Sequence, residues 1–230
     1  MSITREMEKI MKRRKMRNFI KRIFRNFIIL IMLLALCKSG LALFPKTANT
    51  IGDWNLILVN HSYQIPKDYE IELKELPNGK QVDVRIYNSL MRMISDGASE
   101  GYYMIVVEAY RTEAEQQTLM DEKVSSYIDE GYSKIIEKQV AKSWVAVTGT
   151  SEHQLGIAVD INPNCQKSGR EVYGWLAENA HEYGFILRYP EDKVHITGIQ
   201  NEPWHYRYVG EQAAAEMYEQ KICLEEYVKE

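Results

Sequence analysis

The sequence predicts an α+β fold, and two observations support this prediction. Segments rich in strand-forming residues alternate irregularly with segments of helical periodicity, and no regular βαβ repeat connects them. The chain has 230 residues, a length that suits one globular domain with an appendage. Its 13 glycines and 6 prolines exclude collagen-like and linker-like chains, and 3 cysteines are too few for a disulfide-built scaffold.

Charge is distributed unevenly along the chain. Residues 1–25 hold ten Lys or Arg against two Glu, a net charge of +8, and the rest holds 19 of the 29 basic and 30 of the 32 acidic residues, which gives −11. An acidic main domain binds nucleic acid poorly, because phosphate contacts need clustered Lys and Arg. We therefore expect no nucleic-acid partner.

A membrane segment is predicted directly after the basic head. The 11 residues 27–37 are uninterruptedly apolar, and if Lys38 reaches the membrane interface the run continues to Phe44. These 18 residues would span about 27 Å as a helix, close to the ~30 Å hydrocarbon core. A basic flank stays on the cytoplasmic side, so everything after Pro45 is expected outside the cell.

Four parts of the chain follow from this interpretation. They are a basic cytoplasmic head over 1–25, a transmembrane anchor or signal segment over 26–44, a stalk over 45–57 and an extracellular domain over 58–230. Two alternatives remain, since Gly40-Leu-Ala42 offers small residues for signal cleavage and the apolar run could also be a buried soluble helix.

The first elements of the domain are predicted from periodicity. Residues 81–100 carry one helical stripe, formed by Val84, Tyr87, Met91 and Ile94. Residues 103–109 are rich in strand formers. Thr112 and Glu115 form a capping box, which predicts a helix that begins at this box and continues to about residue 130.

The later elements are shorter and follow from the same signals. A helix is expected through residues 172–179 with a stop near Gly184. The remaining expectations are a helix over 132–142, strands over 157–161, 185–189 and 204–208, and a terminal helix over 210–227.

Two of the five histidines lie in settings that suggest a metal centre. His153 and His205, together with Asp160, form a plausible catalytic zinc set, because three protein ligands leave a fourth position for water. A metal hydrolase also needs a base that is not a ligand, and Glu202 is the candidate. Judged by spacing alone, however, two histidines and one aspartate in a chain of this length more commonly belong to no shared site. The sequence has no G-x-S-x-G, S-x-x-K or C-x-x-C motif, so a serine or thiol nucleophile has no support.

The motifs taken together resemble one enzyme family. Ser-x-His-x-x-Gly-x-Ala-x-Asp over 151–160 and Glu-x-Trp-His over 202–205 are similar to those of VanY-type D-alanyl-D-alanine carboxypeptidases, zinc enzymes of the LAS fold. Tyr-Arg-Thr at 110–112 and the segment 183–190 extend the similarity, which covers about residues 54–215. One departure is Ala109, where the family commonly has Gly after a Ser.

The resemblance implies a fold and a metal site. The fold would be a small antiparallel sheet with flanking helices, as in LAS or Hedgehog-like peptidases. The cofactor would be Zn²⁺ held by His153, Asp160 and His205, with Glu202 as catalytic base.

The resemblance also implies substrate-binding residues. Arg111 would bind the free terminal carboxylate of a peptide with its planar fork, and Arg188 is a rival for that role, Arg207 a weaker one. Gln116 and Ser151 match positions that hydrogen-bond the substrate backbone, although turn and cap chemistry explains them equally well.

The expected function is removal of the C-terminal D-alanine from peptidoglycan stem peptides or their precursors by a membrane-anchored monomer. The alternatives are an L,D-carboxypeptidase acting on tetrapeptide stems and a non-catalytic cell-wall-binding module. A D,D-dipeptidase is disfavoured, because an enzyme outside the cell would not meet the cytoplasmic dipeptide. Pairing of Cys165 with Cys223 stays open.

Overall fold

The computed structural model describes residues 46–47, 54–129, 136–164 and 167–228. The predicted head, the apolar segment 26–44 and Cys165 lie outside these residues. Within the described residues, no helix is both long enough and apolar enough to cross a membrane.

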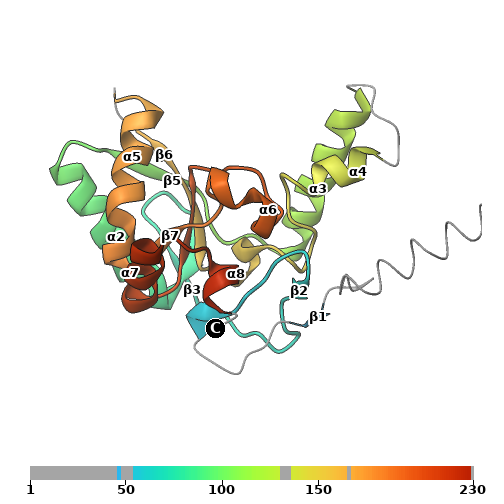
Figure 1. The fold of residues 1–230 in the computed structure, drawn as a ribbon, viewed down its shortest axis with the longest axis horizontal. Helices are drawn as coiled ribbons and strands as arrows, with labels where there is room; N and C mark the ends of the chain where they lie inside the picture. Colours follow the sequence, from blue (N-terminus) through green and yellow to red (C-terminus); the bar gives the residue numbers. More distant parts are fainter. Residues whose placement is uncertain (1–45, 48–53, 130–135, 165–166, 229–230) are drawn as a thin grey trace, which may run out of the picture. The chain divides into compact units, whose positions relative to one another are not determined.

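A four-stranded antiparallel sheet organises the domain (Figure 1). Its strands are β5 (Met104–Glu108), β6 (Ala158–Pro163), β7 (Phe185–Leu187) and β8 (His205–Tyr208). They are ordered β5-β6-β8-β7, and each neighbouring pair runs antiparallel. The predicted α+β class with a small antiparallel sheet is thereby confirmed.

The two faces of this sheet serve different purposes. Alternation along β6 buries Val159 and Ile161 in the hydrophobic core and turns Asp160 to the other face. On β8, Tyr206 joins the core in the same way, and its neighbour His205 shares the face of Asp160. One face therefore builds the core, and the other carries polar residues.

Helices α2 (Val84–Ser99) and α5 (Gly169–Asn179) cover the core face. The N-terminus of α5 is fixed by a capping box of Ser168 and Glu171. After α5, the 3₁₀ turn η3 (Ala180–Tyr183) ends at Gly184, whose φ of 83° lies in the left-handed region, so the predicted stop near this glycine is confirmed.

The predicted apolar stripe of the first helix was wrong. Its buried positions are Ile86, Leu90, Met93 and Gly97, whereas Val84 of the predicted stripe is exposed and the other three residues of that stripe are only partly buried. The helix also begins at Val84, because residues 81–83 pair as strand β4 (Gln81–Asp83) with β3 (Leu73–Glu75). Tertiary pairing thus overrides the local helical pattern.

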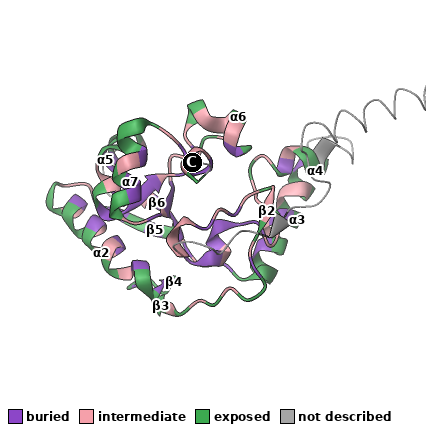
Figure 2. Cartoon of the chain, turned by 60° about the horizontal axis from the view of Figure 1, so that its bottom comes forward, coloured by how far each residue is buried: buried purple, intermediate pink, exposed green. Residues whose placement is uncertain are grey.

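Helices α3 (Glu113–Asp129) and α4 (Ile136–Ala141) lie on the opposite side of the domain from α2 and α5 in both views (Figures 1 and 2). The predicted capping box is present, since the Thr112 backbone and hydroxyl both donate to Glu115 Oε2, at 2.8 and 2.7 Å. These helices share a small apolar cluster of their own, and α3 together with residues 144–146, which follow α4, lines part of the pocket described below.

The predicted terminal helix is two helices. It is divided into α7 (Glu211–Gln220) and α8 (Leu224–Tyr227), because Lys221 adopts a left-handed φ of 56° and ends α7. The other short elements were not predicted and comprise β1 (Lys46–Thr47), β2 (Tyr63–Gln64), α6 (Val194–Thr197) and the 3₁₀ turns η1 (Trp54–Leu56), η2 (Glu152–Leu155) and η4 (Glu191–Lys193).

Candidate active site

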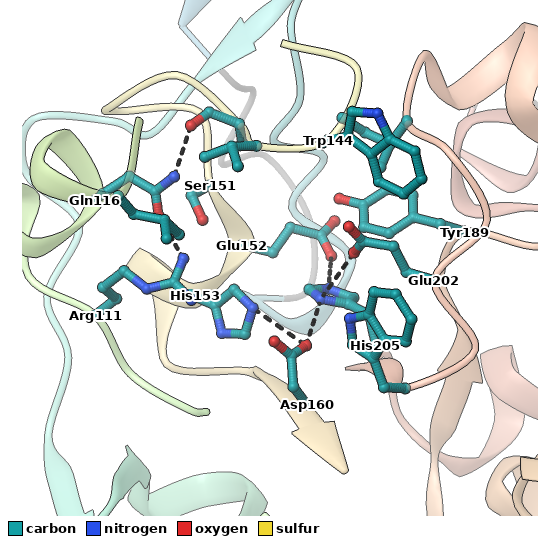
Figure 3. A pocket seen from close by; sticks show the side chains of 15 residues that line it. Arg111, Gln116, Trp144, Ser151, Glu152, His153, Asp160, Tyr189, Glu202 and His205 are labelled. Carbon is teal, nitrogen blue, oxygen red and sulfur yellow. Dashed lines mark hydrogen bonds and ion pairs between the residues drawn. The ribbon is translucent and has the colours of Figure 1, made fainter. Parts of the chain in front are cut away.

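Three potential metal ligands converge on the polar face of the sheet. One donor atom from each of His153, Asp160 and His205 lies within 4.8 Å of the others. Asp160 Oδ1 is 2.9 Å from His205 Nδ1 and 3.5 Å from His153 Nε2, so a single carboxylate oxygen faces both rings (Figure 3). Two imidazoles and one carboxylate leave the fourth position of a tetrahedral centre open.

Strand register explains how residues far apart in the sequence meet here. Asp160 on β6 is the direct cross-strand partner of His205 on β8, and direct partners project from the same face. His153 arrives from η2, which ends at Gly156 with φ 68°. A Cβ at Gly156 would meet Ile71 Cδ1 at 2.3 Å, so glycine is required where the chain turns into β6.

The two rings present different nitrogens to the centre. His153 Nδ1 faces the Ala109 carbonyl at 2.8 Å. Because Nδ1 carries the proton for this hydrogen bond, the lone pair available to a metal is on Nε2. His205 is turned the other way, with Nδ1 facing Asp160 and Nε2 pointing away into the protein. The ring planes are nearly perpendicular, at 88°.

The electrostatic environment suits a cation. Burial opposes a charge on His205, but the hydrogen bond to Asp160 and the nearby carboxylate of Glu152 outweigh this effect and raise the pKa of His205 to about 9. Burial would also raise the pKa of Asp160, yet the two histidines hold it below its usual range. A site that stabilises positive charge beside an ionised carboxylate, with two imidazole donors, fits a zinc ion.

Glu202 lies beside the cluster and is not part of it. Its Oε2 is 3.8 Å from His205 Nδ1, and its backbone is held between Tyr189 and His205 by hydrogen bonds of 3.1 and 3.0 Å. Burial, with a smaller contribution from the Asp160 charge, raises the pKa of Glu202 to about 7. A carboxylate with this affinity for protons is suited to exchange them near neutral pH.

Arg111 faces Glu202 across the pocket (Figure 3). It follows the end of β5, and its backbone N–H donates to the His153 carbonyl at 3.2 Å, which fixes the cation near the candidate ligands. Its Nη1 donates to Gln116 Oε1 at 2.6 Å, and Gln116 Nε2 donates to the Ala146 carbonyl at 2.6 Å. Gln116 thus holds Arg111 in place, and because it also lines the pocket, its predicted contact with the substrate stays a prediction.

The structure contradicts the prediction that Arg188 binds substrate. Its side chain is fully buried and does not line the pocket. Its guanidinium donates to Glu152 and, through two parallel bonds, to Glu225. Arg207 is equally buried, lies 2.9 Å from the same Glu152, and is likewise absent from the residues that line the pocket.

Only some of the residues that line the pocket were predicted from the sequence. Ser151, which was predicted, does line the pocket, together with Glu152 from the same motif. Tyr189 and Trp144 form the wall next to Glu202 (Figure 3). An aromatic residue in a predicted strand or loop carries no sequence signal for a site, but a charged Glu152 among buried neighbours could have been noticed, because such a residue needs a partner.

Comparisons with known proteins point to one enzyme family. The family model described as "VanY: D-alanyl-D-alanine carboxypeptidase" matches residues 79–211. A D-alanyl-D-alanine carboxypeptidase of Enterococcus faecalis is 52% identical over 186 residues, which cover 79% of this chain and 69% of that protein.

Solved structures give the same result. A VanY D,D-pentapeptidase from a VanB-type resistance cassette, in complex with Zn(II), matches with TM-score 0.75 at 52% identity, over 76% of this chain and 99% of that one. VanYB in complex with D-Alanine-D-Alanine matches with TM-score 0.76 at 52% identity, over 77% and 98%. The LdcB LD-carboxypeptidase matches with TM-score 0.63 at 28% identity, over 81% and 98%.

Proposed function

The chain belongs to the VanY family of D-alanyl-D-alanine carboxypeptidases, and from this premise we propose that it removes the C-terminal D-alanine from peptidoglycan stem peptides. One observation carries the proposal: a His–Asp–His cluster, a non-ligand carboxylate and a fixed guanidinium line one pocket. The cluster supplies a metal site, Glu202 a proton acceptor, and Arg111 a partner for a terminal carboxylate.

The cofactor is zinc, and the residues present fit it. His153 Nε2, Asp160 Oδ1 and His205 Nδ1 would hold the ion. When bound, zinc supplies a Lewis acid that polarises a carbonyl and lowers the pKa of water.

The remaining chemistry belongs to the side chains. Arg111 binds the terminal carboxylate of the peptide and so sets which peptide bond reaches the centre. Glu202 accepts a proton from the attacking water, whose oxygen bonds to the carbonyl carbon. When the C–N bond breaks, Glu202 returns that proton to the nitrogen of the leaving D-alanine, and the carboxylate is restored.

Similarity favours D,D over L,D cleavage. The chain is 52% identical to VanY enzymes and 28% identical to the LD-carboxypeptidase, and the TM-scores fall in the same order. The stereochemistry of the penultimate residue is read by pocket shape, and shape follows the wall residues that differ between such relatives.

The deciding experiment compares three substrates on the purified, zinc-loaded chain. D-Alanine release would be measured from a pentapeptide ending in D-Ala-D-Ala, from the tetrapeptide lacking the last residue and from the free dipeptide. We expect the pentapeptide to be cleaved with the highest kcat/KM. Faster release from the tetrapeptide would indicate the L,D alternative, and no release from any substrate would favour a wall-binding module.

We further propose that residues 26–44 anchor the enzyme in the cell membrane with residues 58–230 outside. The support is the basic head of 1–25 followed by the apolar run. Protease added to intact spheroplasts should digest the domain, with a cytoplasmic protein as control. Complete protection of the domain, when lysis makes it digestible, would refute this orientation.

A further inference from the structure

A cluster of buried charges lies at the Nε2 edge of the His205 ring. Glu152 Oε2 is 3.6 Å from His205 Nε2, and both residues are almost fully buried. Neither atom has a hydrogen-bond partner in the described part of the chain, since 3.6 Å is slightly longer than a hydrogen bond. Two complementary polar atoms thus face each other with no competitor.

The other oxygen of Glu152 is held firmly. Oε1 accepts from Arg188 Nε at 2.8 Å and lies 2.9 Å from Arg207 Nη1. With both guanidinium groups at Oε1, Glu152 presents its second oxygen, Oε2, to the imidazole as a hydrogen-bond acceptor.

Further hydrogen bonds hold both arginines in place. Arg188 forms parallel bonds of 2.8 and 2.7 Å to Glu225 of α8. Arg207 Nη2 donates to the Asn55 and Ile57 carbonyls at 3.0 and 2.9 Å. Two carboxylates and two guanidiniums balance in charge, so the cluster is compatible with burial and holds Glu152 in one position.

His205 has two possible neutral tautomers, and they differ in metal binding. With the proton on Nδ1, the ring would donate to Asp160 at 2.9 Å, and Nδ1 would have no lone pair for a metal, since the remaining lone pair is on Nε2, which points away from the cluster. With the proton on Nε2, Nδ1 is free to coordinate, and the N–H needs an acceptor. Glu152 is the acceptor in place.

We propose that Glu152 is a positioning residue that accepts a hydrogen bond from His205 Nε2 and thereby holds this ring in the tautomer that presents Nδ1 to zinc. The inference rests on the proposed function, because it takes His205 as a zinc ligand. Partners of this kind contribute about 10–100-fold to metal affinity.

The test compares Glu152→Gln with Glu225→Gln in the full chain purified in mild detergent. Each substitution removes one buried carboxylate from Arg188, so both perturb the same charge cluster. Only the first changes the group that faces His205. Its amide is expected to turn its oxygen to the two arginines and its NH₂ to Nε2, which favours the wrong tautomer.

Zinc affinity, measured by chelator competition without substrate, should fall about 10–100-fold in Glu152→Gln and less than about 3-fold in Glu225→Gln. An equal loss in both variants, or an unchanged affinity in Glu152→Gln, overturns the proposal. Should Glu152→Gln fail to fold, ¹⁵N NMR of histidine-labelled wild-type protein decides, because an unprotonated Nε2 of His205 in the zinc form contradicts it. A wild-type chain that binds no zinc would instead overturn the metal assignment beneath both proposals.

Discussion

Replacing Arg111 by alanine should reduce kcat/KM by about 10–150-fold on a peptide with a free terminal carboxylate. The Arg111 side chain is 11% exposed, and its guanidinium is held by Gln116 at 2.6 Å, so a contact with a carboxylate would form in a largely dry cleft. A hydrogen bond to a charged group contributes about 1.5–3 kcal/mol, and 1.36 kcal/mol corresponds to about tenfold in rate.

The assay compares two enzymes with two substrates. A peptide ending in D-Ala-D-Ala and its C-terminal amide are each cleaved by wild type and Arg111→Ala, and the double comparison isolates the contact. Loss on the amide should stay below about 3-fold. Arg92→Ala is the matched control, because Arg92 is 59% exposed on α2 and does not line the pocket. An equal loss on both substrates would mean that Arg111 supports the fold and binds no carboxylate.

Three further predictions concern the base, the turn and the thiol. Glu202→Gln should retain zinc and lose at least about 100-fold in kcat, because the general base is removed and the ligands are not; full turnover would exclude this role. Gly156→Ala should lower the free energy of unfolding by at least about 2 kcal/mol in urea denaturation, since φ is 68° and the new Cβ would meet Ile71 and the Asp83 backbone; wild-type stability would contradict the turn. Burial and Glu226 raise the pKa of Cys223 to about 11, so iodoacetamide at pH 8 should label it at least about tenfold faster in denaturant than in the folded protein, as followed by peptide mass spectrometry.

The features that could be predicted are those that depend on residues close together in the sequence. The capping box at Thr112 and the stop at Gly184 depend on neighbours a few residues away, so the sequence displays them. The separation of Asp160 and His205 carries no geometric information by itself, and only the resemblance of the surrounding motifs joined them. Register across β6 and β8 supplies the physical reason.

The parts that could not be predicted depend on distant partners. Arg188 follows a strand, as a site residue often does. Its partners in the interior are carboxylates far away in the sequence, because Glu152 is 36 positions away and Glu225 is 37. A buried cation with two acidic partners has no local signature. The stripe on α2 failed for a related reason, since the side that the sheet covers decides burial, and neighbouring apolar rows on one helix look alike in sequence.

Strand β8 links the chemistry to the support beneath it. His205 and Arg207 are two residues apart and therefore share one face of the sheet, while Tyr206 between them is anchored in the core. A shift of one residue in the register would turn the candidate ligand and the arginine into the core together, and the buried partners of both would be lost. Glu152 contacts both His205 and Arg207, so the position of the imidazole and the charge balance of the interior are not separable. Substitutions at residues of this cluster that lie outside the pocket are therefore expected to disturb the metal site as well.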